Sequence, residues 1–368
     1  MWPNMSNAYF LIPGGLLPPE AVPEALDAGA RQSLEELLGD CRASAPQRLA
    51  QGLLLPFARC THHLWFWAAV TRARTTPAHA GYEWLAENGP ALAGEVWSVT
   101  PCRLQDGRTA GLGGSPLTPR EVEQCSPALR AVLEKSGFVL QLWDAEWYAT
   151  RKQDWAVVAR PWRCQEGFAA DDEEALAGDR GEALALMKAC GEALAGTQVS
   201  QRRRAAGLPA PDFAWISGGG RAVRFYPPTK VRAVLSDEPV LLSWAREAGI
   251  LKEYTAPASA LAWPADAPPG DVIAVVSDLW QPWLQSDWQA WRRALPGALD
   301  KVRTLRSLAR SRGSETAVFV ACGRGCAVTL APERKTLHSR LLGRFSTRRG
   351  PGLAWIAEPA ASPDGAAP

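Results

Sequence analysis

The sequence of 368 residues lacks the features of a nucleic-acid-binding, membrane or secreted protein. Its net charge is only +2, which provides no bulk attraction for nucleic acid or a membrane surface. It contains no run of about 18 apolar residues, the length that a transmembrane helix needs. Residues 1–18 have neither a basic start nor an apolar stretch of signal-peptide length. We therefore expect a cytoplasmic protein with no membrane partner and no nucleic-acid partner.

Histidine is scarce and cysteine is scattered. Only four histidines occur, and His62 and His63 stand close to Cys60, which raises the question of a metal site. Adjacent helical residues point to different faces, so we expect these histidines to be polar residues of the core or of an interface. Of the eight cysteines, only Cys322 and Cys326 are close together, and no second pair has zinc-like spacing. The sequence therefore predicts reduced thiols, no bound metal and no cofactor.

Tryptophan is abundant, with 17 residues against 5 tyrosines. Hydrophobic residues make up 47% of the chain and charged residues 21%, a balance typical of a globular protein with a large core. We expect most tryptophans to fill that core, with a binding groove as the alternative. Predicted strands alternate with predicted helices along the chain. This order indicates an α/β fold with a mixed, mainly parallel sheet flanked by helices.

The predicted domain organisation has three parts. Residues 1–94 form a first strand followed by a mainly helical segment, and residues 95–345 form the α/β core. Within the core, the β-branched run 271–278 is the clearest buried strand. Residues 316–330 read as a hairpin, and a basic helix follows over residues 332–342. Residues 346–368 have the Pro, Ala and Gly content of a disordered tail.

The stretch 181–220 is the most informative. Strong helix formers over 182–204 predict one helix, which must end before Gly207 and the two prolines that follow. A short aromatic strand then leads into Ser217–Gly220, for which we favour a tight turn over an anion site, because it lacks the lysine of a phosphate-binding loop. Residues 95–104 form a strand that ends at the turn Thr100–Arg103. The helix over 288–312 is expected to be broken or kinked near Pro296 and Gly297.

Two blocks resemble the RpfE-type regulatory proteins of bacteria. They comprise Val96–Gln105, and then Leu186-Met187, Thr197-Gln198-Val199, Arg203, Gly207–Trp215 and Gly218. The likeness covers roughly residues 95–330. Arg103, Ser200 and Ala214 depart from the family pattern, where His, Asn and Ser stand. The resemblance implies a non-enzymatic regulatory or accessory protein that binds a small anionic ligand or a protein partner.

The same family is described as distantly related to cofactor-independent phosphoglycerate mutases, of the alkaline-phosphatase superfamily. That relationship implies the alternative function, a phosphoglycerate mutase-like or phosphatase-like phosphotransfer enzyme. Such an enzyme holds two metal ions through several Asp and His residues. Here the first predicted strand ends in Pro13-Gly14-Gly15 and a late one in Ala321–Arg324, none of which is an Asp or His. The resemblance therefore implies a degenerate relative without these metals.

The candidate ligand site combines residues that follow predicted strands. These are Arg103, Ser217, Gly218 and Asp278, together with Arg203 at the end of the predicted helix. Ligands of α/β folds bind where the carboxyl ends of strands meet loops. We therefore expect the three strand ends to surround one cleft, in which the arginines favour an anion. The competing interpretation is that these turns are well-packed corners.

Overall fold

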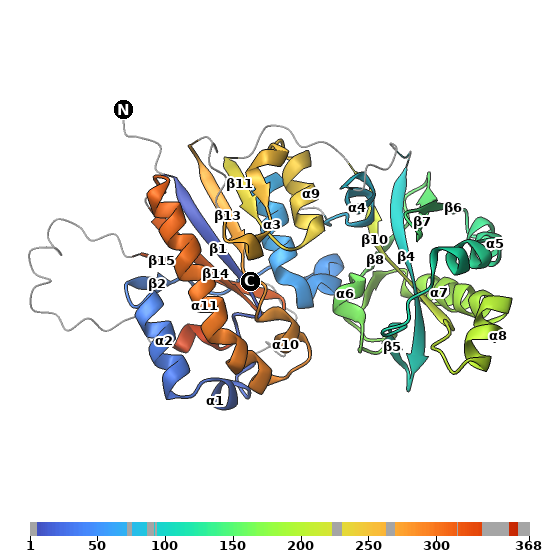
Figure 1. The fold of residues 1–368 in the computed structure, drawn as a ribbon, viewed down its shortest axis with the longest axis horizontal. Coiled ribbons are helices and arrows are strands. Elements are labelled where there is room, and N and C mark those ends of the chain that lie inside the picture. The colour runs from blue at the N-terminus through green and yellow to red at the C-terminus, as the bar shows by residue number, and fades with distance from the viewer. Residues whose placement is uncertain are drawn as a thin grey trace, which may run out of the picture. The chain divides into compact units, whose positions relative to one another are not determined.

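The computed structural model describes residues 6–71, 76–86, 92, 94–222, 230–262, 269–314, 316–332 and 353–359. The chain forms two compact units, drawn in Figure 1. Unit 1 comprises Met1–Leu49, Ala58–Ala73 and Phe225–Pro368, and unit 2 comprises Ala50–Phe57 and Arg74–Arg224. Unit 2 is thus inserted into the sequence of unit 1. The units differ from the predicted domains, which were divided at residues 94 and 345, because strand and helix patterns carry no signal of such an insertion.

Unit 1 is built on a mixed, mainly parallel sheet, which confirms the predicted fold class. The strand order is β12-β11-β13-β1-β14-β15-β2, and β3 also pairs with β15. The first five of these strands run parallel, and the hairpin of β14 and β15 reverses the direction. The strands are β1 (Asn7–Pro13), β2 (Cys41–Ala43), β3 (Gln47–Arg48), β11 (Val231–Leu235), β12 (Thr255–Ala256), β13 (Asp271–Val275), β14 (Thr316–Cys322) and β15 (Cys326–Pro332).

Helices flank this sheet. α11 packs against α2 and β1, whereas α3 packs against α9 and β1, and Figure 1 shows α11 in front of the sheet and α3 behind it. The helices are α1 (Val22–Ala25), α2 (Ala28–Leu38), α3 (Thr61–Thr71), α9 (Pro239–Glu247), α10 (Trp280–Leu284) and α11 (Trp288–Ser311), with short 3₁₀ turns η1 (Gly52–Cys60), η2 (Lys252–Tyr254), η3 (Ala258–Ala260) and η4 (Ala354–Ile356). None of the described helices has the length and apolar character needed to cross a membrane.

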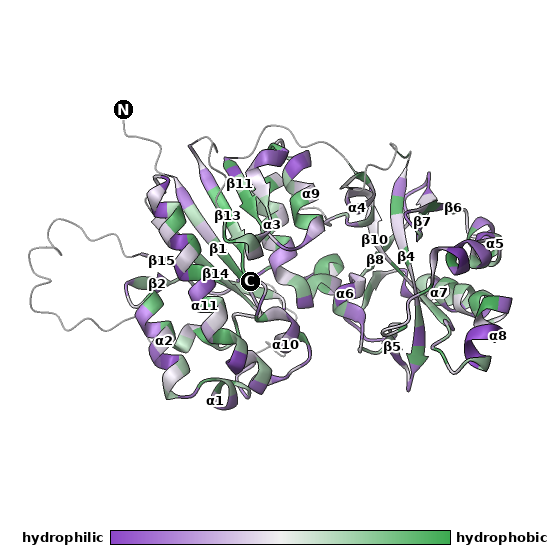
Figure 2. Ribbon diagram, viewed as in Figure 1, coloured by the Kyte–Doolittle hydropathy of each residue, from purple (hydrophilic) through white to green (hydrophobic). Residues whose placement is uncertain are grey.

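Of the predicted break or kink in α11, the break is wrong. The helix is continuous over 24 residues and includes Pro296. Its buried residues, among them Trp291, Leu295 and Leu299, recur at helical spacing, and hydrophilic residues occupy the remaining surface (Figure 2). Pro296 lies on the exposed side, where a carbonyl that loses its intrahelical hydrogen bond can tilt towards water. Packing of the apolar face therefore outweighs the local cost of the proline.

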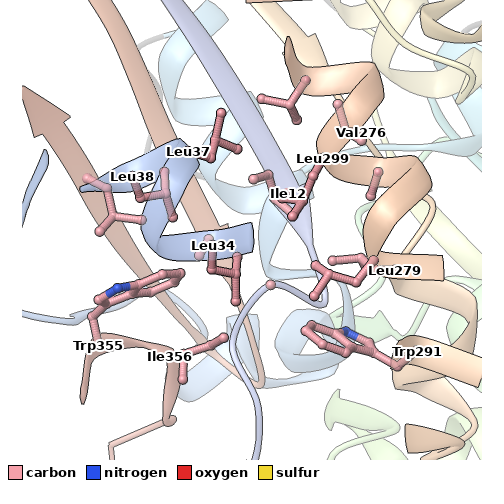
Figure 3. A pocket seen from close by; sticks show the side chains of 16 residues that line it. Ile12, Leu34, Leu37, Leu38, Val276, Leu279, Trp291, Leu299, Trp355 and Ile356 are labelled. Carbon is pink, nitrogen blue, oxygen red and sulfur yellow. The ribbon is translucent and has the colours of Figure 1, made fainter. Parts of the chain in front are cut away.

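A short segment near the end of the chain covers an apolar cavity of unit 1. The cavity has a volume of about 30 Å³ and is lined by residues of β1, α2, α11 and the segment 353–359. Figure 3 shows Trp355 and Ile356 on one side, with Leu34 and Ile12 among the facing residues. The backbone N–H of Leu17 donates to the Ile356 carbonyl at 2.8 Å. Of the predicted tail, only this segment is described, and it packs on unit 1. The predicted helix 332–342 lies almost wholly outside the described residues.

Unit 2 contains a separate antiparallel sheet that the sequence analysis did not foresee. Its order is β10-β4-β7-β6, with β5 paired to β4, and β8 pairs with β9 in a two-stranded ribbon. The elements are α4 (Ala80–Ala86), β4 (Glu95–Gln105), β5 (Arg108–Ala110), α5 (Pro119–Lys135), β6 (Val139–Trp143), β7 (Glu146–Arg151), β8 (Val157–Ala159), α6 (Trp162–Gln165), β9 (Leu176–Gly178), α7 (Arg180–Ala195), α8 (Gln198–Ala205) and β10 (Phe213–Gly220). The sequence predicts a turn over residues 144–148, whereas β7 begins within it at Glu146.

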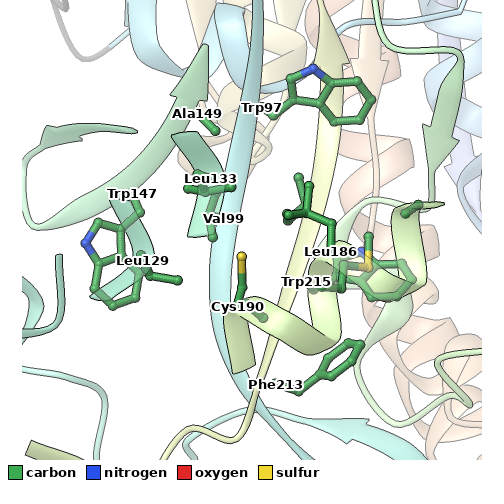
Figure 4. Packing of buried hydrophobic residues seen from close by; sticks show 14 of the residues in the cluster. Trp97, Val99, Leu129, Leu133, Trp147, Ala149, Leu186, Cys190, Phe213 and Trp215 are labelled. Carbon is green, nitrogen blue, oxygen red and sulfur yellow. The ribbon is translucent and has the colours of Figure 1, made fainter. Parts of the chain in front are cut away.

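The predicted helix over 182–204 is two helices. α7 ends at Gly196, and the side chain of Thr197 then caps α8 by accepting a hydrogen bond from the Ser200 N–H at 3.2 Å. α5 and α7 pack on the sheet and enclose the core of unit 2 (Figure 4). Trp215 is fully buried there, as predicted for its strand, and its indole N–H donates to the Arg160 carbonyl at 2.8 Å.

Candidate metal centre

The first turn of α3 presents two buried histidines. The helix begins at Thr61, whose Oγ1 donates to the Gly323 carbonyl at 2.8 Å and so holds the helix start against the end of β14. His62 and His63 follow directly and are 1% and 3% exposed. Leu64, Phe66, Trp67 and Val70 are buried with the histidines, so most of this helix packs inside unit 1. The imidazoles are therefore fixed inside unit 1.

The sheet positions Glu238 beside these two histidines. It lies three residues beyond the carboxyl end of β11 and immediately before α9, whose first residue is Pro239. The Ser236 hydroxyl accepts a hydrogen bond from the Glu238 N–H at 3.1 Å, which fixes the short connection. Glu238 is only 2% exposed. A carboxylate so far from water needs cationic or hydrogen-bonding partners, and α3 supplies them.

Both histidines reach this one carboxylate. His62 Nε2 lies 3.1 Å from Glu238 Oε1, and His63 Nε2 lies 2.8 Å from Oε2. The ring centroids are 4.3 Å apart. The expectation that adjacent helical histidines diverge is therefore wrong for these two. Their side chains leave the helix about 100° apart, but each is long enough to bend towards a carboxylate lying between them, and each meets a different oxygen.

The two histidines favour the ionised form of the carboxylate. Burial raises the pKa of Glu238, but the charge and hydrogen bonds of His62 and His63 outweigh burial and hold its pKa well below the ordinary value. Aromatic rings surround the cluster. Trp280 meets the His62 ring edge-on at 4.5 Å, and Trp244 meets the His63 ring edge-on at 5.7 Å. The negative carboxylate and two imidazoles thus lie in an apolar shell, where electrostatic interactions are strong.

The donor set fits a divalent metal ion. One nitrogen from each histidine and one oxygen from Glu238 all lie within 4.8 Å of one another. Two imidazoles and a carboxylate are typical protein ligands of zinc, at about 2.0–2.2 Å from the ion. Tetrahedral geometry at that radius separates ligand atoms by about 3.4 Å. From Glu238 Oε2 the imidazole nitrogens of His62 and His63 lie 3.4 and 2.8 Å away, so only the distance to His63 must widen, by about 0.6 Å.

The predicted site residues Arg203 and Arg103 contact other residues of unit 2. Arg203 is buried, pairs with Glu121 at 3.0 Å, and donates to the carbonyls of Pro209 and Ser115. Its guanidinium joins α8 to the start of α5 and to the loop before it. Arg103 lies within β4, and its Nη2 reaches the Gly111 carbonyl only at 3.5 Å. The predicted turn Thr100–Arg103 is therefore wrong, because the strand continues to Gln105.

The glycines after Ser217 belong to a strand and not to a loop. β10 continues to Gly220 with a bulge after Ser217, and Gly218 has a φ of +75°. A Cβ on Gly219 would lie 2.1 Å from the Trp97 ring, so the side chain of Trp97 requires glycine at this position. The structure thus assigns these glycines a packing role, which the motif alone did not reveal.

The predicted convergence of three strand ends is also corrected. β4 and β10 are antiparallel, with Cys102 opposite Phe213 and Ser98 opposite Ser217. The end of β4 near Arg103 therefore lies by the start of β10, away from Gly218. Asp278 belongs to unit 1, follows β13 and pairs with Lys301 at 2.9 Å. A ligand role for each of these residues remains a prediction.

The adjacent histidines His62 and His63 are the one signal in the sequence for this centre. Helix geometry, however, predicts that adjacent residues point to different faces. Glu238 was not singled out, because nothing in a Ser-Asp-Glu-Pro stretch marks its glutamate as buried. Its position after a parallel strand was the usable clue, since such positions collect functional side chains.

Comparisons with known proteins identify no family. No protein-family profile and no curated protein matches the sequence. Two solved structures are similar in fold. A cofactor-independent phosphoglycerate mutase from Thermoplasma acidophilum shares 13% identity, with 97% of this chain and 96% of that chain covered and a TM-score of 0.42. The PH0037 protein from Pyrococcus horikoshii shares 12% identity, with 90% and 88% covered and a TM-score of 0.49. Neither is described as an RpfE-type regulator, and that resemblance has no support here.

Proposed function

We propose that this protein binds one divalent transition-metal ion, with zinc the best match, through His62, His63 and Glu238. The observation that carries the proposal is the meeting of three buried donors of the correct type within 4.8 Å. The two imidazoles come from one helical turn and the carboxylate from the end of a parallel strand. Zinc sites use this combination of ligands, and the softer nitrogen donors disfavour magnesium and calcium.

Three protein donors leave a fourth position on the ion. In zinc enzymes that position holds water or a substrate oxygen, whereas purely structural sites use four protein ligands. A small anion with an oxygen donor is therefore the ligand class that a loaded centre would accept. The sequence suggests two functions, a regulatory protein that binds a small anion and a phosphotransfer enzyme. Both would bind such an anion. We favour the second, because a bound zinc ion polarises phosphoryl oxygens and acidifies water.

The alternative is a metal-free triad in which one protonated imidazole pairs with Glu238. A buried ion pair of this kind brings little net stability, because desolvation of both groups offsets their attraction. The proposal replaces the expectation from sequence that no metal is bound. It places the centre at the carboxyl edge of the parallel sheet, where ligands of α/β folds collect.

The test is metal titration of the stripped protein, by calorimetry and elemental analysis. We expect one zinc per chain in the wild type and a loss of at least a hundredfold in affinity in His62→Gln, His63→Gln and Glu238→Gln. His79→Gln is the matched control, since His79 is a buried histidine of unit 2 outside the cluster. Equal zinc binding by all four variants, or none by the wild type, rules the centre out. If the zinc-bound wild type hydrolyses p-nitrophenyl phosphate, the protein is an enzyme. If it does not, an anion-binding regulator is favoured.

A further inference from the structure

A second cavity of unit 1 lies at the opposite edge of the sheet. It has a volume of about 210 Å³ and is bounded by the amino ends of β1, β11 and β13 and by the middle of α3. Its lining includes two aromatic rings, one lysine and one aspartate, on an apolar floor; these residues are Tyr9, Trp65, Lys230, Asp271, Val231 and Ile273. It shares no residue with the metal centre. The cavity is therefore a second, separate candidate binding site.

The aromatic rings form two walls. The centroids of Tyr9 and Trp65 are 5.7 Å apart, and the rings are tilted by 53°. Both side chains are half-buried and line the cavity. The Tyr9 hydroxyl accepts a hydrogen bond from the Asn7 side-chain amide at 3.3 Å. Aromatic walls of this kind offer a flat surface on which a ligand ring can stack.

The two charged residues lie on neighbouring strand ends. The Asp271 N–H donates to the Lys230 carbonyl at 3.2 Å, so their backbones are adjacent. Within the part of the chain that the structure describes, Lys230 and Asp271 form no ion pair, although both line this cavity. Asp271 Oδ1 accepts the Asn7 N–H at 2.9 Å, which fixes the carboxylate. Burial and the charge of Asp271 raise the pKa of Tyr9, so its hydroxyl stays neutral beside that carboxylate.

We propose that this cavity binds a small aromatic zwitterion, an amino acid with an aromatic side chain being the simplest member of the class. The ligand ring lies against the contacting rings of Tyr9 and Trp65, the ammonium group faces Asp271, and the carboxylate faces Lys230. The volume of about 210 Å³ is large enough for a small organic molecule such as an amino acid. Asp271 and Lys230 then bind the two charged ends of one ligand instead of pairing with each other.

The experiment measures binding of four probes to the full chain by calorimetry and saturation-transfer NMR. L-phenylalanine carries all three groups, phenethylamine lacks the carboxylate, hydrocinnamate lacks the amine, and L-alanine lacks the ring. We expect L-phenylalanine to bind at least about tenfold more tightly than each of the others, because phenethylamine and hydrocinnamate each lose one charge-assisted contact and L-alanine loses the burial of the ring. Equal binding of the three aromatic probes, or no binding of L-phenylalanine at millimolar concentration, overturns the proposal.

Two substitutions locate the binding. Asp271→Asn keeps an acceptor for the Asn7 N–H, and Lys230→Met keeps the length of the side chain, so both variants are expected to fold. Each should weaken L-phenylalanine binding about tenfold or more and remove the preference over the probe that lacks the matching group. Glu253→Gln and Lys252→Met are the controls, since both residues are exposed in η2 of the same unit and outside the cavity. Equal losses in variants and controls would place the ligand elsewhere. His62→Gln should leave this binding intact, which separates it from the metal centre.

Discussion

His63 Nε2 lies 2.8 Å from Glu238 Oε2, although 175 residues separate the two along the chain. The contact joins the first turn of α3 to the end of β11, and every described atom of the pair is shielded from water. Such a contact persists only if both groups are paired, because neither a buried carboxylate nor a charged imidazole is tolerated alone. Unit 1 is therefore expected to be sensitive to substitution of either partner.

Glu238→Ala should destabilise the metal-free protein by about 3–5 kcal/mol, the cost of breaking a buried charge pair from one side. Zinc at a hundredfold excess over its Kd should stabilise the wild type by about 2.7 kcal/mol and should not stabilise the variant. Chemical denaturation with and without zinc measures both quantities. A variant as stable as the wild type would show that the carboxylate is dispensable to the fold.

Trp215→Ala should destabilise the protein by about 3–5 kcal/mol, because it empties a large site in the core of unit 2. The indole N–H that satisfies the Arg160 carbonyl is also lost. Trp215→Phe keeps most of the volume and is expected to lose less. Urea denaturation of the three proteins tests the order, and equal stability of Trp215→Ala and the wild type would contradict the burial of this side chain.

Gly219→Ala should cost about 1–3 kcal/mol, the usual penalty for overpacking. The added methyl group would lie 2.1 Å from the Trp97 ring, so the ring or the strand must move. Gly114→Ala is the matched control, because a Cβ there meets nothing within 4 Å. Thermal melts should show a lower melting temperature for Gly219→Ala than for Gly114→Ala. An unchanged melting temperature for Gly219→Ala would mean that the Trp97 ring can move aside without a cost in stability.

Glu121 should contribute stability that depends on pH. Burial is the largest single influence and raises its pKa, but the backbone N–H and hydroxyl of Thr118, together with Arg203, outweigh burial and lower the pKa below the ordinary value. A lowered pKa in the folded state means that the contribution is complete above the unfolded pKa and is lost as the pH falls through the folded pKa. Glu121→Gln should therefore be destabilising by about 1 kcal/mol at pH 7 and nearly neutral in acid.

Denaturation across this pH range tests the prediction. Glu123→Gln serves as the control, because Glu123 is exposed on the same helix. A loss that stays constant from neutral to acidic pH would assign the effect of Glu121→Gln to helix propensity and not to its charge.

Local patterns of the sequence were sufficient to predict elements with strong signals. The buried strand at 271–275 and the hairpin around Gly325 formed as expected. Thr118 followed by Glu121 is the pattern of a capped helix start, and the capping box is present. The sequence also predicts a strand at 222–226, which lies almost entirely outside the described residues. Patterns failed where distant residues decide the outcome. Pro296 sits in a continuous helix because packing holds it, and Ser217–Gly220 is strand because Trp97 covers it.

The candidate site was the least predictable part for the same reason. Motifs drew attention to arginines and glycines, which the structure uses to join and pack its elements. The donors of the metal centre come from residues 62, 63 and 238, and only the sheet topology brings them together. Helix geometry was a sound argument for two isolated histidines, but it took no account of a carboxylate placed between them.

The position of β1 has a consequence for biosynthesis. β1 lies between β13 and β14, where Ala8 is opposite both Val272 and Ala317. At about 5–20 residues per second, the ribosome needs roughly 13–50 s to add the 260 or so residues between these strands. Residues 74–224 emerge within that interval and can fold as unit 2, while the apolar run Ala8–Ile12 still has no partner strand. The nascent chain thus carries an unpaired, aggregation-prone strand past a folded unit, which makes it a natural client for chaperones.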